Sequence, residues 1–172
     1  MYNPNKITKL VTAALFAAMT CVVTLFLHIP IPNTNGGYIH PGDSLVLMSG
    51  IILGPIYGGL SAGIGSMLAD LFAGATQYMV ATFIIKLLTA VIAAYSYRYI
   101  RKQSIIMAGI LGAIIVTLGY FICDRILLGN FASASISIPF NLLQNAMGII
   151  LASIILPVLI KVPQIRKMVE EK

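Results

Sequence analysis

Charged residues are scarce in this chain of 172 residues: Asp, Glu, Lys and Arg together make up 9%, whereas hydrophobic residues make up 59%. Typical soluble domains carry about 25% charged residues. A chain with this composition has too little polar surface to cover a core in water. The composition therefore excludes a soluble fold and predicts a single integral membrane domain over residues 1–172.

Reactive motifs are also missing. Cys21 and Cys123 lie in separate apolar stretches without a Cys-x-x-Cys pair, which excludes a disulfide framework and leaves no metal site. The only histidines are His28 and His40, whereas a rhomboid-type intramembrane protease needs a histidine from a later helix. We therefore expect neither an enzyme nor a metal protein.

Long apolar stretches predict an all-α membrane protein, a compact bundle of six transmembrane helices. The second and third stretches are shorter than the roughly 20 residues that cross a bilayer, and a turn over 54–59 joins them. A re-entrant pair over 43–75 is the alternative. The six spans are 7–27, 43–58, 59–75, 79–97, 105–125 and 139–160.

Basic residues indicate the orientation, because cytoplasmic loops are rich in lysine and arginine. They gather before the first span, between the fourth and fifth, and after the sixth, which predicts cytoplasmic N- and C-termini. Loops 28–42, 74–78 and 126–138 then face outward. Topology accounts for the net charge of +6 without nucleic-acid binding. The nine basic residues of these three segments are Lys6, Lys9, Arg98, Arg101, Lys102, Lys161, Arg166, Lys167 and Lys172; Lys86 and Arg125 lie elsewhere.

Polar residues at membrane depth gather near the outward end of the predicted bundle. Hydrocarbon penalises such groups, so they are expected to pair, meet water or bind a solute. A cluster at one end predicts a pocket open to one side and not a pore. Its members are Asp43, Asp70, Tyr78, Lys86, Asp124, Arg125, Asn141, Gln144 and Asn145.

Spacing selects the residues expected to bind a solute. Gly58, Ala62, Ser66 and Asp70 recur every four residues, which places Asp70 on a packed helix face. The three neighbouring amides offer donors and acceptors, and the tyrosines offer ring faces. The predicted substrate-binding residues are Asp70, Tyr78, Lys86, Tyr120, Asn141, Gln144 and Asn145.

Other roles for the charged residues stay open. Asp70 and Lys86 are candidates for an internal ion pair that serves stability alone. Asp43 is a candidate N-cap of the second helix, and Arg125 is a candidate interfacial residue. Tyr38 and His40 lie in loop 28–42, which is predicted to be either a lid over the pocket, with a sharp turn at Asn35-Gly36, or an ordinary connector.

Four motifs, in this order and spacing, resemble the substrate-binding S components of energy-coupling factor (ECF) vitamin transporters. The resemblance is strongest over residues 37–95, and size and span number match along nearly the whole chain. The motifs are Gly37-Tyr38-Ile39-His40-Pro41-Gly42-Asp43, Leu53-Gly54-Pro55-Ile56-Tyr57-Gly58-Gly59, Ile64-Gly65-Ser66-Met67-Leu68-Ala69-Asp70-Leu71 and Ala81-Thr82-Phe83-Ile84-Ile85-Lys86.

The resemblance implies a multi-pass protein of the bacterial cell membrane that captures a vitamin or precursor from outside and reorients in the lipid bilayer. Its implied partners are a transmembrane coupling subunit and two cytoplasmic ATPases. ATP is used by those partners, since this chain has no Gly-x-x-x-x-Gly-Lys-Ser/Thr loop and is expected to bind no cofactor directly. The implied docking residues, for which packing within the chain is the alternative, are Ala13, Ala14, Ala17 and Ala18.

Substrate identity is the least constrained part of the prediction. The resemblance is nearest to the branch for hydroxymethylpyrimidine or vitamin B6 compounds, with the pantothenate branch next. An unpaired Lys86 would favour a carboxylate-bearing solute, whereas Asp70 or Asp124 would favour a protonated amine or ring nitrogen. If Asp70 and Lys86 neutralise each other, a neutral pyridine or pyrimidine fits best. A self-sufficient carrier of small solutes is the alternative function.

Overall fold

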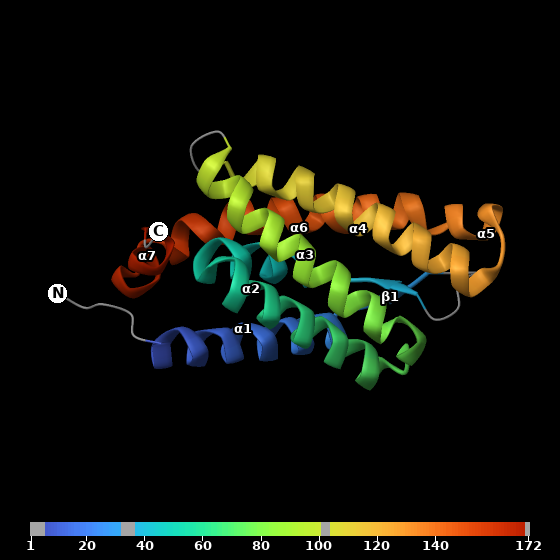
Figure 1. The fold of residues 1–172 in the computed structure, drawn as a ribbon, viewed down its shortest axis with the longest axis horizontal. Coiled ribbons are helices and arrows are strands. Elements are labelled where there is room, and N and C mark those ends of the chain that lie inside the picture. The colour runs from blue at the N-terminus through green and yellow to red at the C-terminus, as the bar shows by residue number, and fades with distance from the viewer. Residues whose placement is uncertain (1–5, 32–36, 101–103, 171–172) are drawn as a thin grey trace.

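Apolar helices run side by side along one axis in the computed structural model, which describes residues 6–31, 37–100 and 104–170 (Figure 1). The Asn35-Gly36 turn and the basic residues Arg101, Lys102 and Lys172 lie outside the described residues. The long helices are α1 (Lys6–Phe26), α2 (Asp43–Ala73), α3 (Met79–Tyr99), α4 (Ile105–Leu128) and α6 (Ser137–Leu159). The short elements are β1 (Ile29–Pro30), β2 (Tyr38–Ile39), η1 (Thr76–Tyr78), α5 (Phe131–Ser135) and α7 (Pro163–Glu170).

Large apolar side chains cover the outside of the bundle. Leu15, Val80, Ile114 and Ile154 are all exposed, each on a different helix. Within the described residues, five helices are long and apolar enough to cross a membrane. Such an outward-facing apolar surface suits lipid and not water, so the chain is a multi-pass membrane protein.

The helix α2 doubles back on itself at Gly54. Gly54 has φ 82° and ψ −178°, and Pro55 begins the second limb. Ser49 Oγ donates a hydrogen bond of 3.2 Å to the Gly58 carbonyl, although nine residues separate them, about 13 Å along a straight helix. The two limbs, 43–53 and 55–73, therefore form a hairpin, and the described residues contain six helical segments along the bundle.

The turn lies at the first residues of the predicted turn over 54–59. The second span was placed over 43–58, but its helix ends at residue 53, giving a length of about 16 Å. That limb cannot cross a hydrocarbon core of about 30 Å alone. The predicted end of the second span at residue 58 was wrong, because apolar residues continue past Gly54 and residues 55–58 belong to the next limb. The second limb, 55–73, has nearly the predicted extent.

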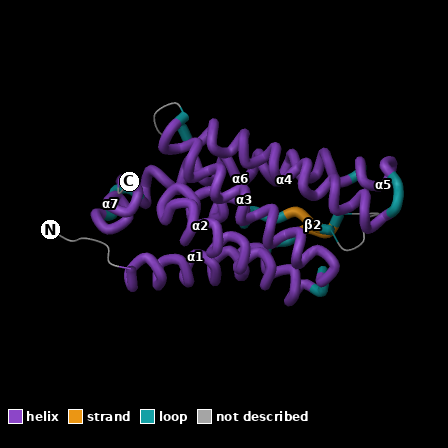
Figure 2. The backbone as a smooth tube through the Cα atoms, viewed as in Figure 1, coloured by secondary structure: helices purple, strands orange, loops and turns teal. Residues whose placement is uncertain are grey.

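A short strand pair precedes the first limb of α2. The strands β1 and β2 pair antiparallel, with Ile29 opposite Ile39, and Figure 2 shows this pair among the helices and not beyond their ends. Ile31 and Ile39 are buried. Non-helical backbone is tolerated at membrane depth where protein covers it. Among the described residues the regular structure is thus helical apart from one short strand pair that the sequence did not predict.

Small residues bring the α2 hairpin against its neighbours. A Cβ atom on Gly50 would lie 2.1 Å from the Ala90 carbonyl oxygen of α3, and one on Gly58 would lie 2.3 Å from that of Ser49. Ala62 and Ser66 are also buried. The four-residue pattern predicted in the sequence therefore packs helices closely, as small residues do in membranes.

The apolar core lies toward the end of the bundle where both termini are found (Figure 1). Met48, Ile51 and Ile52 of the first α2 limb pack there with Leu156 of α6 and Met168 of α7. The sequence did not predict α7, nor the short α5 within the expected loop 126–138. Asn130 caps α5 by accepting a hydrogen bond of 2.7 Å from the Ser133 amide.

Candidate functional site

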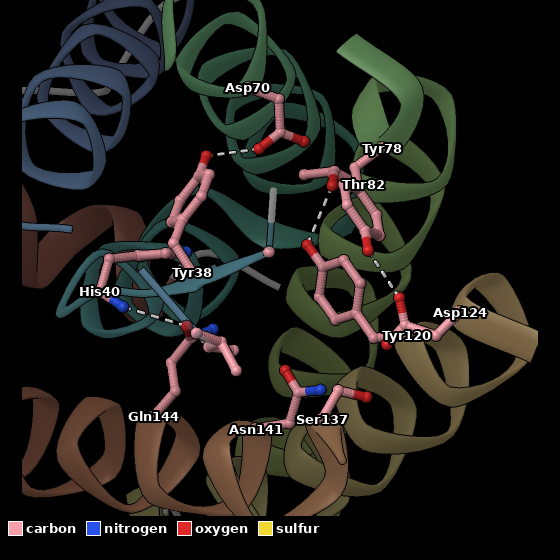
Figure 3. Close-up of a pocket in the computed structure, with 12 residues that line it drawn as sticks. Tyr38, His40, Asp70, Tyr78, Thr82, Tyr120, Asp124, Ser137, Asn141 and Gln144 are labelled. Atoms are coloured by element: carbon pink, nitrogen blue, oxygen red, sulfur yellow. Dashed lines mark hydrogen bonds between the residues drawn. The ribbon is translucent and has the colours of Figure 1, made fainter. Parts of the chain in front are cut away.

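A polar cavity lies at the end of the bundle opposite the termini. The space between its walls is about 450 Å³ when the open solvent at its mouth is included. Figure 3 shows Asp70 at one edge, Asn141 and Ser137 at the opposite edge, and tyrosine rings on both sides. The lining residues are Ile31, Gly37, Tyr38, His40, Asp70, Tyr78, Thr82, Tyr120, Asp124, Ser137, Asn141 and Gln144.

A buried ion pair lies beneath this cavity. Lys86 Nζ lies 2.5 Å from Asp43 Oδ1, and both side chains are almost fully buried. Gln144 Nε2 donates a bond of 2.7 Å to the other oxygen, Asp43 Oδ2. Each charge thus has an opposite charge or a hydrogen-bond partner, as buried charges require.

Two interpretations of these charges were wrong. Asp43 makes no N-cap hydrogen bond; the cap position is Gly42, and Asp43 opens the helix with its carboxylate turned into the bundle. Lys86 pairs with Asp43 and not with Asp70. Lys86 is also absent from the cavity wall, and its ammonium lies 5.4 Å from the centre of the Tyr120 ring. Lys86 therefore lies outside the cavity wall and positions Asp43 next to the lining residue Gln144.

The segment containing Tyr38 and His40 covers one side of the cavity. The Tyr38 hydroxyl donates a hydrogen bond to Asp70 Oδ1, and the His40 amide donates one of 3.0 Å to Gln144 Oε1 (Figure 3). These bonds join the loop to α2 and α6. The loop therefore forms part of the cavity wall and is more than a connector.

His40 is held as a neutral ring. Burial lowers its pKa to about 4, since desolvation penalises the charged form. The Gly42 amide donates to His40 Nδ1 at 3.1 Å, and Thr24 Oγ1 lies 3.2 Å from the same nitrogen. Because Nδ1 accepts, the ring proton resides on Nε2. Burial and the nearby Asp70 carboxylate likewise raise the pKa of Tyr38, which stays a phenol.

Tyr78 of η1 and Tyr120 of α4 form the facing wall. The Tyr78 hydroxyl donates a bond of 2.8 Å to Asp124 Oδ1, and the hydroxyls of Tyr120 and Thr82 lie 3.0 Å apart. The rings of Tyr78 and Tyr120 meet edge to face with centroids 6.4 Å apart. These contacts fix the rings of Tyr78 and Tyr120 in a cavity wall that also contains the carboxylates of Asp70 and Asp124.

The three predicted amides separate in space. Asn141 and Gln144 line the cavity, whereas Asn145 does not. Asn145 Nδ2 donates a hydrogen bond of 2.7 Å to the Asn141 carbonyl. The Asn145 side chain borders an apolar groove between α4 and α6 on the bundle exterior. The placement of Asn145 in the pocket was therefore wrong, because successive helix residues point about 100° apart.

Several lining residues were not among the predicted binding residues. Asp124 and Thr82 carried a signal, since both are polar at membrane depth and Thr82 lies four residues from Tyr78 and from Lys86. Ile31, Gly37 and Ser137 carried none. Arg125, predicted as interfacial, lies with its guanidinium 4.5 Å from the centre of the Phe131 ring and away from the cavity.

The four alanines of α1 that were predicted to dock a partner lie on two different faces of the helix. The Ala13 carbonyl accepts a bond of 2.9 Å from Ser61 Oγ, and the Ala17 carbonyl would lie 2.4 Å from a Cβ on Gly65. Both therefore pack against the second limb of α2. Ala14 and Ala18 are exposed on the bundle surface, so only these two are free to meet another protein.

Comparison with known proteins gives consistent matches. A family model described as the S component of an ECF-type riboflavin transporter matches residues 4–161. An uncharacterized protein in a gap 3′ region of Pyrococcus woesei is 31% identical over 131 residues, covering 76% of this chain and 86% of that protein. The thiamine precursor transporter HmpT of Lactococcus lactis subsp. cremoris (strain MG1363) is 26% identical over 162 residues, covering 92% of this chain and 91% of HmpT.

A solved structure shares the fold. It is described as the S component of a bacterial ECF transporter, and it superposes with a TM-score of 0.72 at 22% sequence identity. The match covers 91% of this chain and 98% of that one. The arrangement of helices is therefore common to both proteins.

Proposed function

This chain belongs to the S-component family of ECF-type transporters, and from that premise we propose that it captures a vitamin or vitamin precursor outside the cell. It is a transport subunit and not an enzyme. The observation that carries the proposal is the polar cavity at one end of an otherwise apolar bundle. A cavity of this kind can bind a solute but gives it no polar path to the other end.

The substrate that the cavity suits best is a nitrogen heteroaromatic such as hydroxymethylpyrimidine or a vitamin B6 compound. Tyrosine rings offer flat apolar surfaces, and Asp70, Asp124 and Asn141 offer polar atoms at the ring edges. Pantothenate is a weaker candidate, because its carboxylate needs a cation and Lys86 is paired with Asp43. The relative HmpT, named a thiamine precursor transporter, supports the pyrimidine choice.

Delivery in this proposal depends on partners. The family associates with an ECF module, and we expect a transmembrane coupling subunit with two ATPases that bind and hydrolyse the ATP. Both termini lie at the end away from the cavity (Figure 1), and the basic residues favour the cytoplasm for that end. The loaded protein would then reorient in the bacterial cell membrane to present its cavity to the cytoplasm.

Identifying small molecules that copurify with the protein by mass spectrometry tests this proposal. We expect a B-group vitamin or precursor, and sub-micromolar binding when the purified protein is titrated with hydroxymethylpyrimidine, pyridoxine, pantothenate and riboflavin. Folded protein that binds none of these would overturn the proposal. Uptake by this chain alone into ATP-free vesicles would instead establish the self-sufficient carrier.

A further inference from the structure

Asp70 is the one lining residue in the described part of the chain with a buried carboxylate oxygen that lacks a partner. The residue lies in the last turn of α2 and is 5% exposed. Its Oδ1 accepts a hydrogen bond from the Tyr38 hydroxyl. Its Oδ2 is buried and has no partner in hydrogen-bond geometry; the Thr82 hydroxyl, which is paired with Tyr120, lies near enough to stabilise the carboxylate. A buried, unsatisfied carboxylate oxygen costs free energy unless a donor reaches it. A bound solute can supply that donor, since Asp70 borders the cavity.

The cavity wall contains no free cation among the described residues. Asp70 and Asp124 are its two acidic residues, and no lysine or arginine lines it. The nearest ammonium, Lys86, contacts Asp43 at 2.5 Å. His40 is neutral at ordinary pH, because burial holds its pKa at about 4. The wall is therefore acidic overall and repels anionic solutes.

We propose that Asp70 Oδ2 anchors an N–H donor of a flat, uncharged or cationic heteroaromatic solute, and that the same carboxylate holds the Tyr38 lid closed over it. This inference rests on the proposed capture function. Asp70 would bind the solute through Oδ2 and the Tyr38 hydroxyl through Oδ1. The N–H donor of the solute would therefore determine both how tightly the solute binds and how firmly Tyr38 is held over it. Tyr38 and Tyr120, on opposite sides of the cavity in Figure 3, would flank the ring. Carboxylate-bearing solutes would be rejected.

Two nearly isosteric probes test the anchor. The first is 4-amino-5-hydroxymethyl-2-methylpyrimidine, and the second carries a methyl group in place of its amino group. The wild-type protein should bind the amine about 30-fold or more tightly, because the analogue leaves a buried carboxylate oxygen unpaired. A third probe with a carboxylate in that position should bind more weakly still.

Asp70→Asn gives the matching protein change. It should weaken amine binding about 10- to 100-fold and reduce the preference between the first two probes to about threefold or less. Tyr38→Phe is the control: it removes the lid bond but should keep the preference, with faster dissociation of both probes. Retention of the full preference by folded Asp70→Asn would overturn the anchor.

The outcomes separate this inference from the proposed function. If the wild-type protein binds both probes equally tightly, capture of a heteroaromatic solute stands and the Asp70 anchor fails. If folded wild-type protein binds no B-group vitamin or precursor, the capture function itself fails. Should Asp70→Asn not fold, the preference of the wild-type protein among the three probes still decides the matter.

Discussion

At the scale of single residues, the Asp43–Lys86 pair joins three parts of the chain. Asp43 begins the first limb of α2, Lys86 lies in α3, and Gln144 of α6 donates to the same carboxylate. Gln144 also accepts from the His40 amide. Through Gln144, the pair therefore fixes the position of the segment with Tyr38 and His40 that covers the cavity. Loss of the pair is expected to lower the free energy of unfolding more than the affinity for solute.

Lys86→Met tests that role. It leaves the Asp43 carboxylate buried without its cation, which should lower the free energy of unfolding by about 3–5 kcal/mol. The double change Asp43→Asn with Lys86→Met should restore much of this loss. Thermal unfolding in detergent measures both, with exposed Lys161→Met as the control. A Lys86→Met protein of wild-type stability that fails to bind solute would contradict the structural role.

His40 predicts a pH dependence of stability. Its pKa is about 4 in the folded protein against an ordinary value of 6.5, so the unfolded chain binds the proton more readily. The stabilisation is fully present above about pH 6.5 and declines as the pH falls toward 4, by about 3 kcal/mol in total. His40→Asn should flatten that decline in thermal unfolding at several pH values. The exposed His28→Asn should retain it; an unchanged slope in His40→Asn would assign the effect to other groups.

At the scale of elements, the α2 hairpin depends on glycines at its contacts. Gly58→Ala would place a methyl group 2.3 Å from the Ser49 carbonyl oxygen, and backbone cannot yield as a side chain can. The expected loss is about 2–3 kcal/mol of unfolding free energy. Gly112→Ala is the matched control, because its new methyl group meets only the side chains of Thr89 and Leu47 at 3.1 Å and 3.3 Å. Equal stability of both variants in detergent would show that the hairpin adjusts freely.

The elements also show what sequence can predict. Four spans, 7–27, 79–97, 105–125 and 139–160, agree with α1, α3, α4 and α6 to within a few residues, because long apolar runs define them. The predicted turn over 54–59 includes Gly54, but the second span was ended at residue 58 because Ile56 and Tyr57 continue the apolar run beyond Gly54. The strand pair was missed because each strand has only two residues, too few to show an alternating pattern in the sequence.

The cavity was predictable in location but not in detail. Asp70, Tyr78, Tyr120, Asn141 and Gln144 line it, as their depth in the predicted helices suggested. The partner of a buried charge is not encoded locally: Lys86 finds Asp43 43 residues away. The face on which Asn145 lies likewise follows from the rotation of α6, which the sequence alone does not fix.

At the scale of the whole molecule, one surface of α1 is free for a partner. Ala14→Leu enlarges an exposed small residue, so it should reduce copurification with a coupling subunit severalfold while solute binding stays within about twofold. Ala13→Leu is the contrasting variant, since Ala13 packs on α2 and should lose stability instead. Copurification of Ala14→Leu at the wild-type level would place the docking surface elsewhere.

The hairpin and its buried charges have a consequence for biosynthesis. Asp43 leaves the ribosome 43 residues before Lys86 and 101 residues before Gln144. Until those partners arrive, Asp43 at membrane depth would be an isolated charge, which lipid disfavours. The early-translated segment 28–53 is therefore expected to enter the bundle only after α3 and α6 have been inserted. The order of synthesis and the order of assembly would differ in this chain, with its lid region made early and settled last.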